Sequence, residues 1–313
     1  MPADKTMSII EQAARRLEEL DRAGVDVPWK VVDGSGAGAR PEPVAASRPA
    51  RLPDAPRLAT MQPAAAAGDE ERVDIVLDIE GLQRAGELVR TDTRSVQSEE
   101  LRAIKRPLLK NARSKNAAAQ RLPLIMITSA LPGEGKTFFS INLAMSIATE
   151  IDLSVLLVDA DVLRQEAMER LGVGPGPGLL DLLGDPTMAL DDVVLRTNVP
   201  KLSILRAGYR QNLSTELLAS SAMDKLLHRL ANDHPRQIVV FDAPPLLLAN
   251  QAKVLASHLG QVVVIVEAAR TQRHTVQQAF AALEQCPIVM SVLNKSNEED
   301  AGEGYGYGYG YGS

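Results

Sequence analysis

Cysteine is nearly absent from this chain, which has a single one, Cys286, among its 313 residues. A lone cysteine excludes a disulfide framework and any metal site built from several cysteines. The four histidines lack the spacing of metal ligands, and a net charge of −6 argues against a nucleic-acid-binding surface. We therefore expect neither a resident metal centre nor a nucleic-acid partner.

Long hydrophobic runs are also missing. No stretch approaches the roughly 20 apolar residues needed to cross a bilayer, and the N-terminal residues lack the apolar region of a secretory signal. With 45% hydrophobic residues, the chain can still bury one substantial core. We expect a cytoplasmic protein without a membrane span, recruited to the inner face of the membrane through a partner.

The strongest positive signal is the segment from Ala130 to Thr137, which reads ALPGEGKT. Residues 122–129 predict a short buried strand and residues 138–149 a buried helix, the context of a phosphate-binding loop. Its backbone N–H groups would surround the β- and γ-phosphates, with Lys136 as a point charge and the Thr137 hydroxyl on Mg²⁺. The expected nucleotide contacts are Pro132, Gly133, Glu134, Gly135, Lys136, Thr137 and Phe138.

One residue of this loop is unusual, because Ala130 stands where such loops normally begin with glycine. Alanine is small and readily adopts negative φ angles. The turn is therefore expected to form unless this position requires a left-handed backbone.

Two further apolar segments end in aspartates. Residues 154–158 lead into Asp159 and Asp161, which lie two apart and can face one pocket, and residues 237–241 lead into Asp242. Ligand-binding side chains collect at the carboxyl ends of parallel strands, and paired carboxylates need a cation such as nucleotide-bound Mg²⁺. Taken alone, the first pair could be a solvated loop, and Asp242 could cap the next helix.

Alternation of strands and helices continues along the chain and predicts an α/β fold with a doubly wound, mostly parallel sheet. The additional expected strands are 201–205, 261–266 and 288–293, and the additional helices are 214–230 and 271–285.

These patterns divide the chain into five parts. Residues 1–32 should hold a helix, either weakly packed or a docking peptide, and residues 33–69 a flexible linker rich in proline and alanine. Residues 70–120 should form an extended segment followed by a charged helix. Residues 121–297 would be the P-loop domain, and residues 298–313 a disordered tail.

The tail is distinctive because four of the five tyrosines of the chain alternate there with glycine. A row of phenols beside a nucleotide site suggests phosphoryl acceptors, although such a segment could also be low-complexity sequence that associates weakly by stacking. The expected acceptors are Tyr305, Tyr307, Tyr309 and Tyr311.

Together these features resemble the bacterial tyrosine kinases, a P-loop class of protein kinase. The resemblance rests on the loop, on the Asp-Ala-Asp strand end with Arg164 beyond it, on Asp-Ala-Pro-Pro from residue 242, and on the terminal tyrosines. Glu99, Arg102 and Lys105 are similar to a motif that assembles family members into rings, with Lys105 in place of the usual arginine. Alone, this charge pattern would be a solvated helix face. More narrowly, the chain resembles autokinases that accompany exosortase and exopolysaccharide loci.

The resemblance implies an ATP-dependent protein-tyrosine autokinase that regulates exopolysaccharide synthesis or export. Lys136 would stabilise the transferring phosphoryl group, and Asp159 or Asp161 would accept the phenolic proton. Asp161 and Asp242 would also join Thr137 around Mg²⁺.

The same resemblance implies a contact of Asn294 with adenine, although Asn-Lys also suits an ordinary turn. It further implies assembly into a ring and activation by a transmembrane chain-length protein, here a separate polypeptide. The alternative is a positioning-type P-loop ATPase that acts as a nucleotide-switched scaffold. Such ATPases normally carry a second lysine near the start of the loop, and its absence here favours the kinase.

Overall fold

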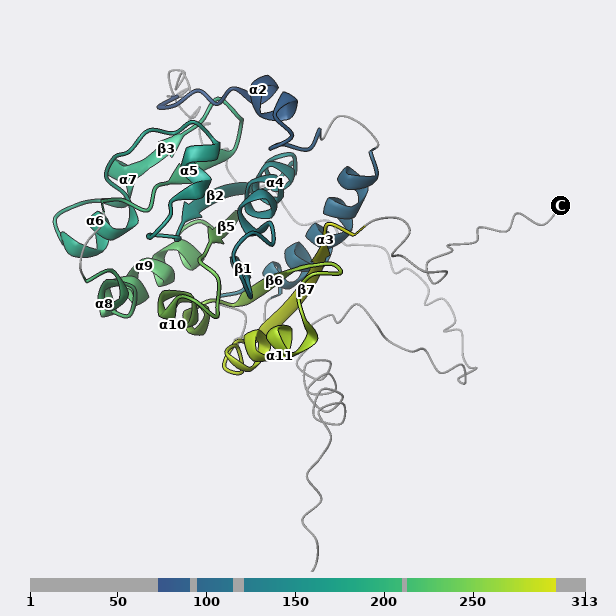
Figure 1. Ribbon diagram of the computed structural model, residues 1–313. Coiled ribbons are helices and arrows are strands. Elements are labelled where there is room, and N and C mark those ends of the chain that lie inside the picture. Colours follow the sequence, from purple (N-terminus) through teal and green to yellow (C-terminus); the bar gives the residue numbers. More distant parts are fainter. Residues whose placement is uncertain (1–72, 91–94, 115–120, 210–212, 297–313) are drawn as a thin grey trace, which may run out of the picture. The chain divides into compact units, whose positions relative to one another are not determined.

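The computed structural model describes residues 73–90, 95–114, 121–209 and 213–296 (Figure 1). The expected N-terminal helix, the proline-rich linker and the tyrosine tail lie outside these residues.

A seven-stranded sheet forms the centre of the described residues, in the order β3-β4-β2-β5-β1-β6-β7. Neighbouring strands are parallel except β3, which pairs antiparallel with β4 at one edge. The expected doubly wound, mostly parallel sheet is therefore confirmed. The strands are β1 (Leu124–Ser129), β2 (Ser154–Asp159), β3 (Val194–Arg196), β4 (Leu202–Leu205), β5 (Gln237–Asp242), β6 (Gln261–Glu267) and β7 (Ile288–Asn294).

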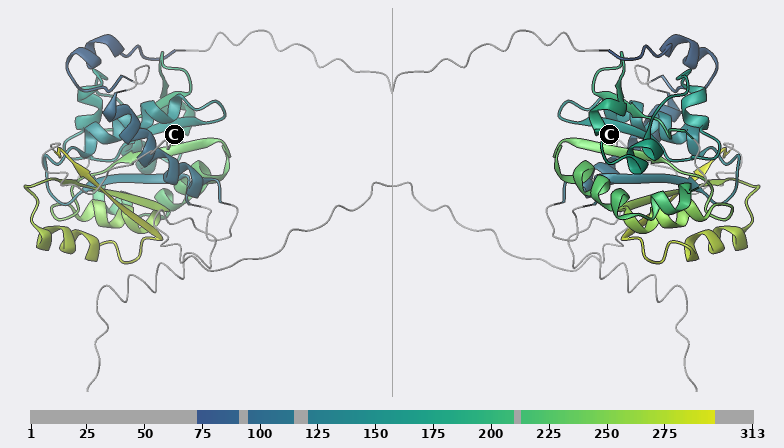
Figure 2. Two further views of the ribbon diagram at one scale, coloured as in Figure 1. Left: turned by 90° about the vertical axis from the view of Figure 1, so that its right-hand side faces the viewer. Right: turned by 90° about the vertical axis from the view of Figure 1, so that its left-hand side faces the viewer.

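Alternate residues of the central strands enter two separate hydrophobic cores, one on each face of the sheet. In β1, for example, Leu124 and Met126 belong to one core, whereas Ile125 and Ile127 belong to the other. Burial on both faces explains why these strands are continuously apolar in sequence. Helices cover the two faces of the sheet (Figure 2). They are α2 (Ile79–Arg84), α3 (Val96–Ala112), α4 (Lys136–Ala148), α5 (Glu166–Arg170), α6 (Leu179–Gly184), α7 (Leu190–Val193), α8 (Ser214–Leu218), α9 (Ser221–Asn232), α10 (Asn250–His258) and α11 (Arg273–Ala281).

The single helix expected over residues 214–230 is wrong, because two helices, α8 and α9, occupy this region. Ser220 separates them. Its hydroxyl accepts a hydrogen bond from the Met223 N–H and caps α9, and serine is favoured at such a cap. Sequence periodicity also missed the short helices α2, α5, α7 and α10 and the edge strand β3.

The segment before α3 packs on the P-loop side of the sheet. Leu77, Leu82 and Leu88 are buried in the same core as α4, and Ile75 forms a short parallel bridge with Thr197. The expected extended segment is thus present from residue 73 to α2. No helix within the described ranges is long and apolar enough to span a bilayer.

Helix α3 is joined to the sheet by a buried amide, that of Gln261 at the start of β6. Its Nε2 donates to the carbonyl oxygens of Leu108 at 3.1 Å and Leu122 at 2.6 Å, while its Oε1 accepts from Asn111 at 3.0 Å. Gln261 is fully buried, so no water can replace these bonds without rearrangement.

We predict that Gln261→Ala lowers the free energy of unfolding by about 1–3 kcal/mol, because it leaves buried carbonyl groups without a donor. Urea denaturation should give a lower midpoint with an unchanged slope. The exposed Gln278→Ala in α11 is the matched control and should change stability by less than about 0.5 kcal/mol. Equal stabilities of the two variants would contradict the role of Gln261.

Candidate active site

The turn between β1 and α4 adopts the expected loop conformation. Gly133 and Gly135 have φ angles of 85° and 100°, which alanine would adopt only with strain. Gly135 is the N-cap of α4, so the loop ends at the positive end of a helix of 13 residues. Ala130 is fully buried and is not among the residues with positive φ. Alanine at this position is therefore compatible with the turn.

Asp242, at the end of β5, is fixed by two hydroxyl groups from the first turns of α4. Thr137 donates to its Oδ2 and Ser140 to its Oδ1, both at 2.9 Å. Asp242 is fully buried, which raises its pKa, while Lys136 and the two hydroxyls act in the opposite direction. Ser140 was not identified from the sequence, although it follows Lys136 by four residues and therefore lies on the same face of α4.

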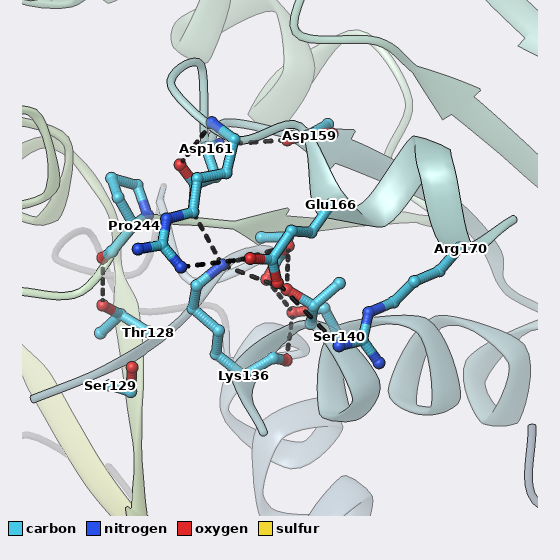
Figure 3. Close-up of polar contacts among 12 residues, drawn as sticks. Thr128, Ser129, Lys136, Ser140, Asp159, Asp161, Glu166, Arg170 and Pro244 are labelled. Carbon is cyan, nitrogen blue, oxygen red and sulfur yellow. Dashed lines mark hydrogen bonds and ion pairs between the residues drawn. The ribbon is translucent and has the colours of Figure 1, made fainter. Parts of the chain in front are cut away.

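Lys136 is surrounded by carboxylates. Its Nζ lies 2.9 Å from Asp161 Oδ2 and 3.6 Å from Asp242 Oδ2 (Figure 3). Burial alone would lower the lysine pKa, but Asp242 and Asp161 outweigh this effect and hold the pKa above its ordinary value. Lys136 is therefore a cation, held by these two acids and by a hydrogen bond of 3.1 Å that its Nζ donates to the Thr137 hydroxyl.

Asp159 lacks such compensation. Its Oδ1 accepts a hydrogen bond from the Asp161 N–H at 3.1 Å, but its Oδ2 is buried without a hydrogen-bond partner. Burial, followed by the charges of Asp242 and Asp161, raises the pKa of this carboxyl group well above its usual range. The sequence expectation that Asp159 and Asp161 lie together beside the loop agrees with this geometry.

A pocket of about 380 Å³ opens beside the loop. The loop contributes Pro132, Gly133, Gly135, Lys136, Thr137 and Phe138. The remaining lining residues are Gly86, Glu87, Arg164, Glu166, Arg170, Asn294 and Lys295. Lys136 lies between the pocket and the aspartates. It lines the pocket and contacts Asp161 and Asp242, whereas neither aspartate lines the pocket. Glu87, Glu166 and Arg170 carried no recognisable sequence motif and were missed, whereas Lys295 was noted only as part of the Asn-Lys pair.

The end of β7 supports the phosphate-binding loop from the side. Asn294 Nδ2 donates to the Glu134 carbonyl, and Lys295 Nζ donates to the Gly133 carbonyl, both at 2.8 Å. The Glu134 carboxylate in turn accepts from the Leu131 N–H and from the Thr271 hydroxyl. The expected nucleotide-binding residues Glu134 and Asn294 are thus brought together at the loop, with Asn294 in the pocket wall.

The oxygen atoms around Lys136 suit a magnesium ion held together with a nucleotide. Mg²⁺ prefers hard oxygen ligands and is usually bound by one or two carboxylates plus substrate phosphates. Thr137, Asp161 and Asp242 supply a hydroxyl and carboxylates, and the unpartnered Asp159 oxygen can accept from a metal-bound water. The described residues contain no group of three or more histidine, cysteine and acidic side chains arranged to hold a metal.

The three residues of the expected assembly motif differ in exposure. Glu99 and Arg102 form an ion pair of 2.7 Å on the surface of α3, with 56% and 38% of their side chains exposed. Lys105 is only 7% exposed and contacts the Glu150 carboxylate at 2.6 Å and the Ser146 carbonyl at 2.9 Å. Within the chain its ammonium group joins α3 to α4, and its part in an interface between copies stays a prediction. The acceptor tyrosines lie outside the described residues.

We predict that Asp159→Asn stabilises the protein in magnesium-free buffer at neutral pH by about 0.5–2 kcal/mol, because it removes a buried charge without changing side-chain shape. The raised pKa of Asp159 determines how this gain in stability changes with pH. Ionisation of Asp159 costs folding energy above the ordinary aspartate pKa of about 4, so the gain should grow as the pH rises above that value and vanish below it.

Thermal denaturation of both proteins across pH 4 to 8, with a chelator present, measures this difference. Asp152→Asn, at an exposed position before β2, is the control and should show no pH-dependent gain. A destabilised Asp159→Asn protein at neutral pH would show that the carboxylate is favourably paired, contrary to the geometry.

Comparison with known proteins yields named relatives. The chain matches no known protein-family model. It is 33% identical over 189 residues to the tyrosine-protein kinase Ptk of Acinetobacter johnsonii, covering 59% of this chain and 25% of that protein. It covers only 21% of the EpsB proteins of Ralstonia, named putative tyrosine-protein kinases. The chain therefore spans a quarter or less of these relatives.

Other relatives are covered more fully. The tyrosine-protein kinase CpsD of Streptococcus agalactiae is 31% identical over 182 residues, which cover 57% of this chain and 77% of CpsD. Among solved structures, the VpsO kinase domain is 31% identical with a TM-score of 0.51, covering 65% of this chain and all of that one. On this similarity, the chain belongs to the bacterial tyrosine kinase family.

Proposed function

We propose that this protein is an ATP-dependent tyrosine autokinase that transfers a phosphoryl group to the tyrosines of its C-terminal segment. The observation that carries this proposal is the arrangement around Lys136, which lines the pocket and contacts the strand-end acids. Membership of the tyrosine kinase family and the row of four tyrosines support the choice of acceptor.

Nucleotide binding would begin with an exchange of partners at Lys136. The phosphates of ATP would be held by the loop N–H groups and by the lysine ammonium, which gives up its contacts with Asp161 and Asp242. This exchange frees the acids that Lys136 now neutralises. Thr137, Asp161 and Asp242 would hold Mg²⁺, which supplies charge stabilisation to the phosphates.

Proton transfer is assigned to Asp159. Of the two candidate aspartates, Asp161 is engaged by Lys136, whereas Asp159 has an oxygen without a partner and a raised pKa that makes it a better proton acceptor. The phenolic oxygen forms a bond to the γ-phosphorus, the bond from phosphorus to the β–γ bridging oxygen breaks, and the phenolic proton passes to the Asp159 carboxylate. ADP leaves with the bridging oxygen.

The acceptor segment has the necessary reach. From Asn294, in the pocket wall, to Tyr305 there are about 11 residues, which span at most roughly 40 Å when extended. This length permits modification in the same chain or in a neighbour. Adenine is proposed to lie near Asn294, at the end of the pocket opposite α5.

Cellular role and partners extend the proposal. By resemblance, we propose that the kinase regulates exopolysaccharide synthesis or export and that a transmembrane chain-length protein activates it at the membrane. Four phosphotyrosines would add on the order of −6 to −8 charges to an already acidic chain. Repulsion between such tails would separate assembled copies.

We predict that Lys136→Met lowers phosphate incorporation from radioactive ATP by about 100-fold or more, because the transferring phosphoryl group loses its main cation. Mass spectrometry of the C-terminal peptide should show phosphate on Tyr305 to Tyr311 in the unchanged protein. Lys253→Met on α10 is the control and should retain full incorporation. Phosphate release from ATP with unmodified tyrosines would instead support the alternative, a nucleotide-switched scaffold.

We also predict that Glu99→Gln combined with Arg102→Gln shifts the protein towards monomers without loss of stability, because both side chains lie on the surface of α3. Lys105→Met should lower the melting temperature, because it removes a buried contact within the chain. Sedimentation and thermal denaturation separate the two effects, with the exposed Lys225→Gln as control. Assembly unaffected by the double change would remove Glu99 and Arg102 from the interface.

A further inference from the structure

One wall of the nucleotide pocket comes from outside the P-loop machinery. Gly86 and Glu87, which follow α2, line the same pocket as Lys136 and Thr137. They lie about 50 residues before the loop in sequence, and no motif marks them. The segment from Gly86 to Val89 is called the upstream wall below.

The upstream wall is held against the P-loop helix by one buried amide, that of Asn142 in α4. Asn142 Nδ2 donates to the Glu87 carbonyl at 3.0 Å, and its Oδ1 accepts from the Val89 N–H at 2.7 Å. Leu88, between them, is buried in the core shared with α4. The backbone of the upstream wall is therefore fixed relative to the phosphate-binding loop, because α4 starts at the end of that loop.

The Glu87 side chain bears a charge that a nucleotide pocket would not favour. Glu87 and Glu166 both line a pocket proposed for a triphosphate. Like charges at close range are unfavourable unless cations separate them. Arg170 provides that cation, with Nη1 2.7 Å from Glu87 Oε2 and Nη2 4.0 Å from Glu166 Oε2.

Arg170 reaches the pocket from α5, as Figure 3 shows, where the side chains of Glu166 and Arg170 extend from this helix towards the region of Lys136. Asn294 and Lys295 line the pocket from the end of β7, where adenine is proposed to bind. With the loop between them, the end of the triphosphate that is most distant from adenine would face α5. The terminal phosphate would therefore be the part of ATP nearest to Arg170.

We propose that Arg170 is a further phosphate-binding residue, specific for the terminal phosphate of ATP, and that Glu87 is the counter-ion that holds it in the nucleotide-free protein. This inference rests on the nucleotide site proposed above. On ATP binding the guanidinium leaves Glu87 and pairs with the γ-phosphate, since a planar guanidinium can bind phosphate oxygens by two parallel hydrogen bonds. ADP lacks this group and leaves the Arg170–Glu87 pair in place.

The proposed change of partner of Arg170, from Glu87 to the γ-phosphate, would couple the bound nucleotide to the upstream wall. While Arg170 holds Glu87, the wall is attached to both α4 and α5. When the guanidinium pairs with the γ-phosphate, the upstream wall keeps only its contacts with Asn142 and with the hydrophobic core. The triphosphate state thus differs from the diphosphate state in how firmly the upstream wall is attached.

The test measures binding of MgATP and MgADP to the full-length protein by calorimetry. Arg170→Gln should weaken MgATP about three- to tenfold and change MgADP less than twofold, because only the γ-phosphate loses a partner. Glu87→Gln should strengthen MgATP binding several-fold, because the guanidinium no longer has to leave a carboxylate. Arg170→Lys keeps the charge but not the planar fork, so it should fall between the unchanged protein and Arg170→Gln.

Arg229→Gln, an exposed change on α9 that also removes an ion pair, is the matched control and should leave both affinities unchanged. Equal losses for ATP and ADP in Arg170→Gln, or weaker ATP binding in Glu87→Gln, would overturn the inference. These measurements need no phosphoryl transfer. A protein that shows the ATP-specific shift but leaves its tyrosines unmodified would support this inference and contradict the proposed kinase activity.

Discussion

The chemistry of this protein depends on the attraction between one ammonium group and the acids at the ends of two parallel strands. Lys136 lies 2.9 Å from Asp161 and 3.6 Å from Asp242, and all three side chains are buried. The fold creates this closeness, because parallel strands bring their carboxyl ends to one edge and the loop returns the lysine over it. Without the lysine, three buried carboxylates would repel one another and none could remain ionised at low cost.

In the nucleotide-free protein, Lys136 neutralises these acids. In the proposed reaction, the contacts between the lysine and the acids must break before the phosphates can bind. Asp159 illustrates the compromise, since its buried oxygen without a hydrogen-bond partner is unfavourable to the folded state but suits the proton transfer proposed above. Natural active sites commonly retain such unfavourable groups, which the remaining structure compensates. Here the two hydrophobic cores and the buried amides of Gln261 and Asn142 provide that compensation.

Sequence alone identified the parts of the site that have fixed local spacing. The loop, Asp159 and Asp242 stand at strand ends, where a few adjacent residues determine geometry, and the mostly parallel sheet followed from alternating elements. Glu87 and Arg170 escaped notice, because their pairing joins positions 83 residues apart and depends on how the fold brings the segment after α2 to α5. The contact of Lys105 with Glu150 within the chain was not predicted for a related reason: the charge pattern of a helix does not show which charges a neighbouring helix buries.

Lys295 has a left-handed φ of 58°, lines the nucleotide pocket and donates to Gly133 of the loop. The first tyrosine of the C-terminal segment, Tyr305, follows it by ten residues. The point from which that segment departs is therefore the rim of the pocket itself. In the reaction proposed above, each tyrosine is joined through the chain to the rim of its own nucleotide pocket, and a neighbouring copy could be modified only if its pocket lies within the same length of chain. In that reaction, the distance between adjacent pockets would decide between modification within one chain and modification of a neighbouring copy.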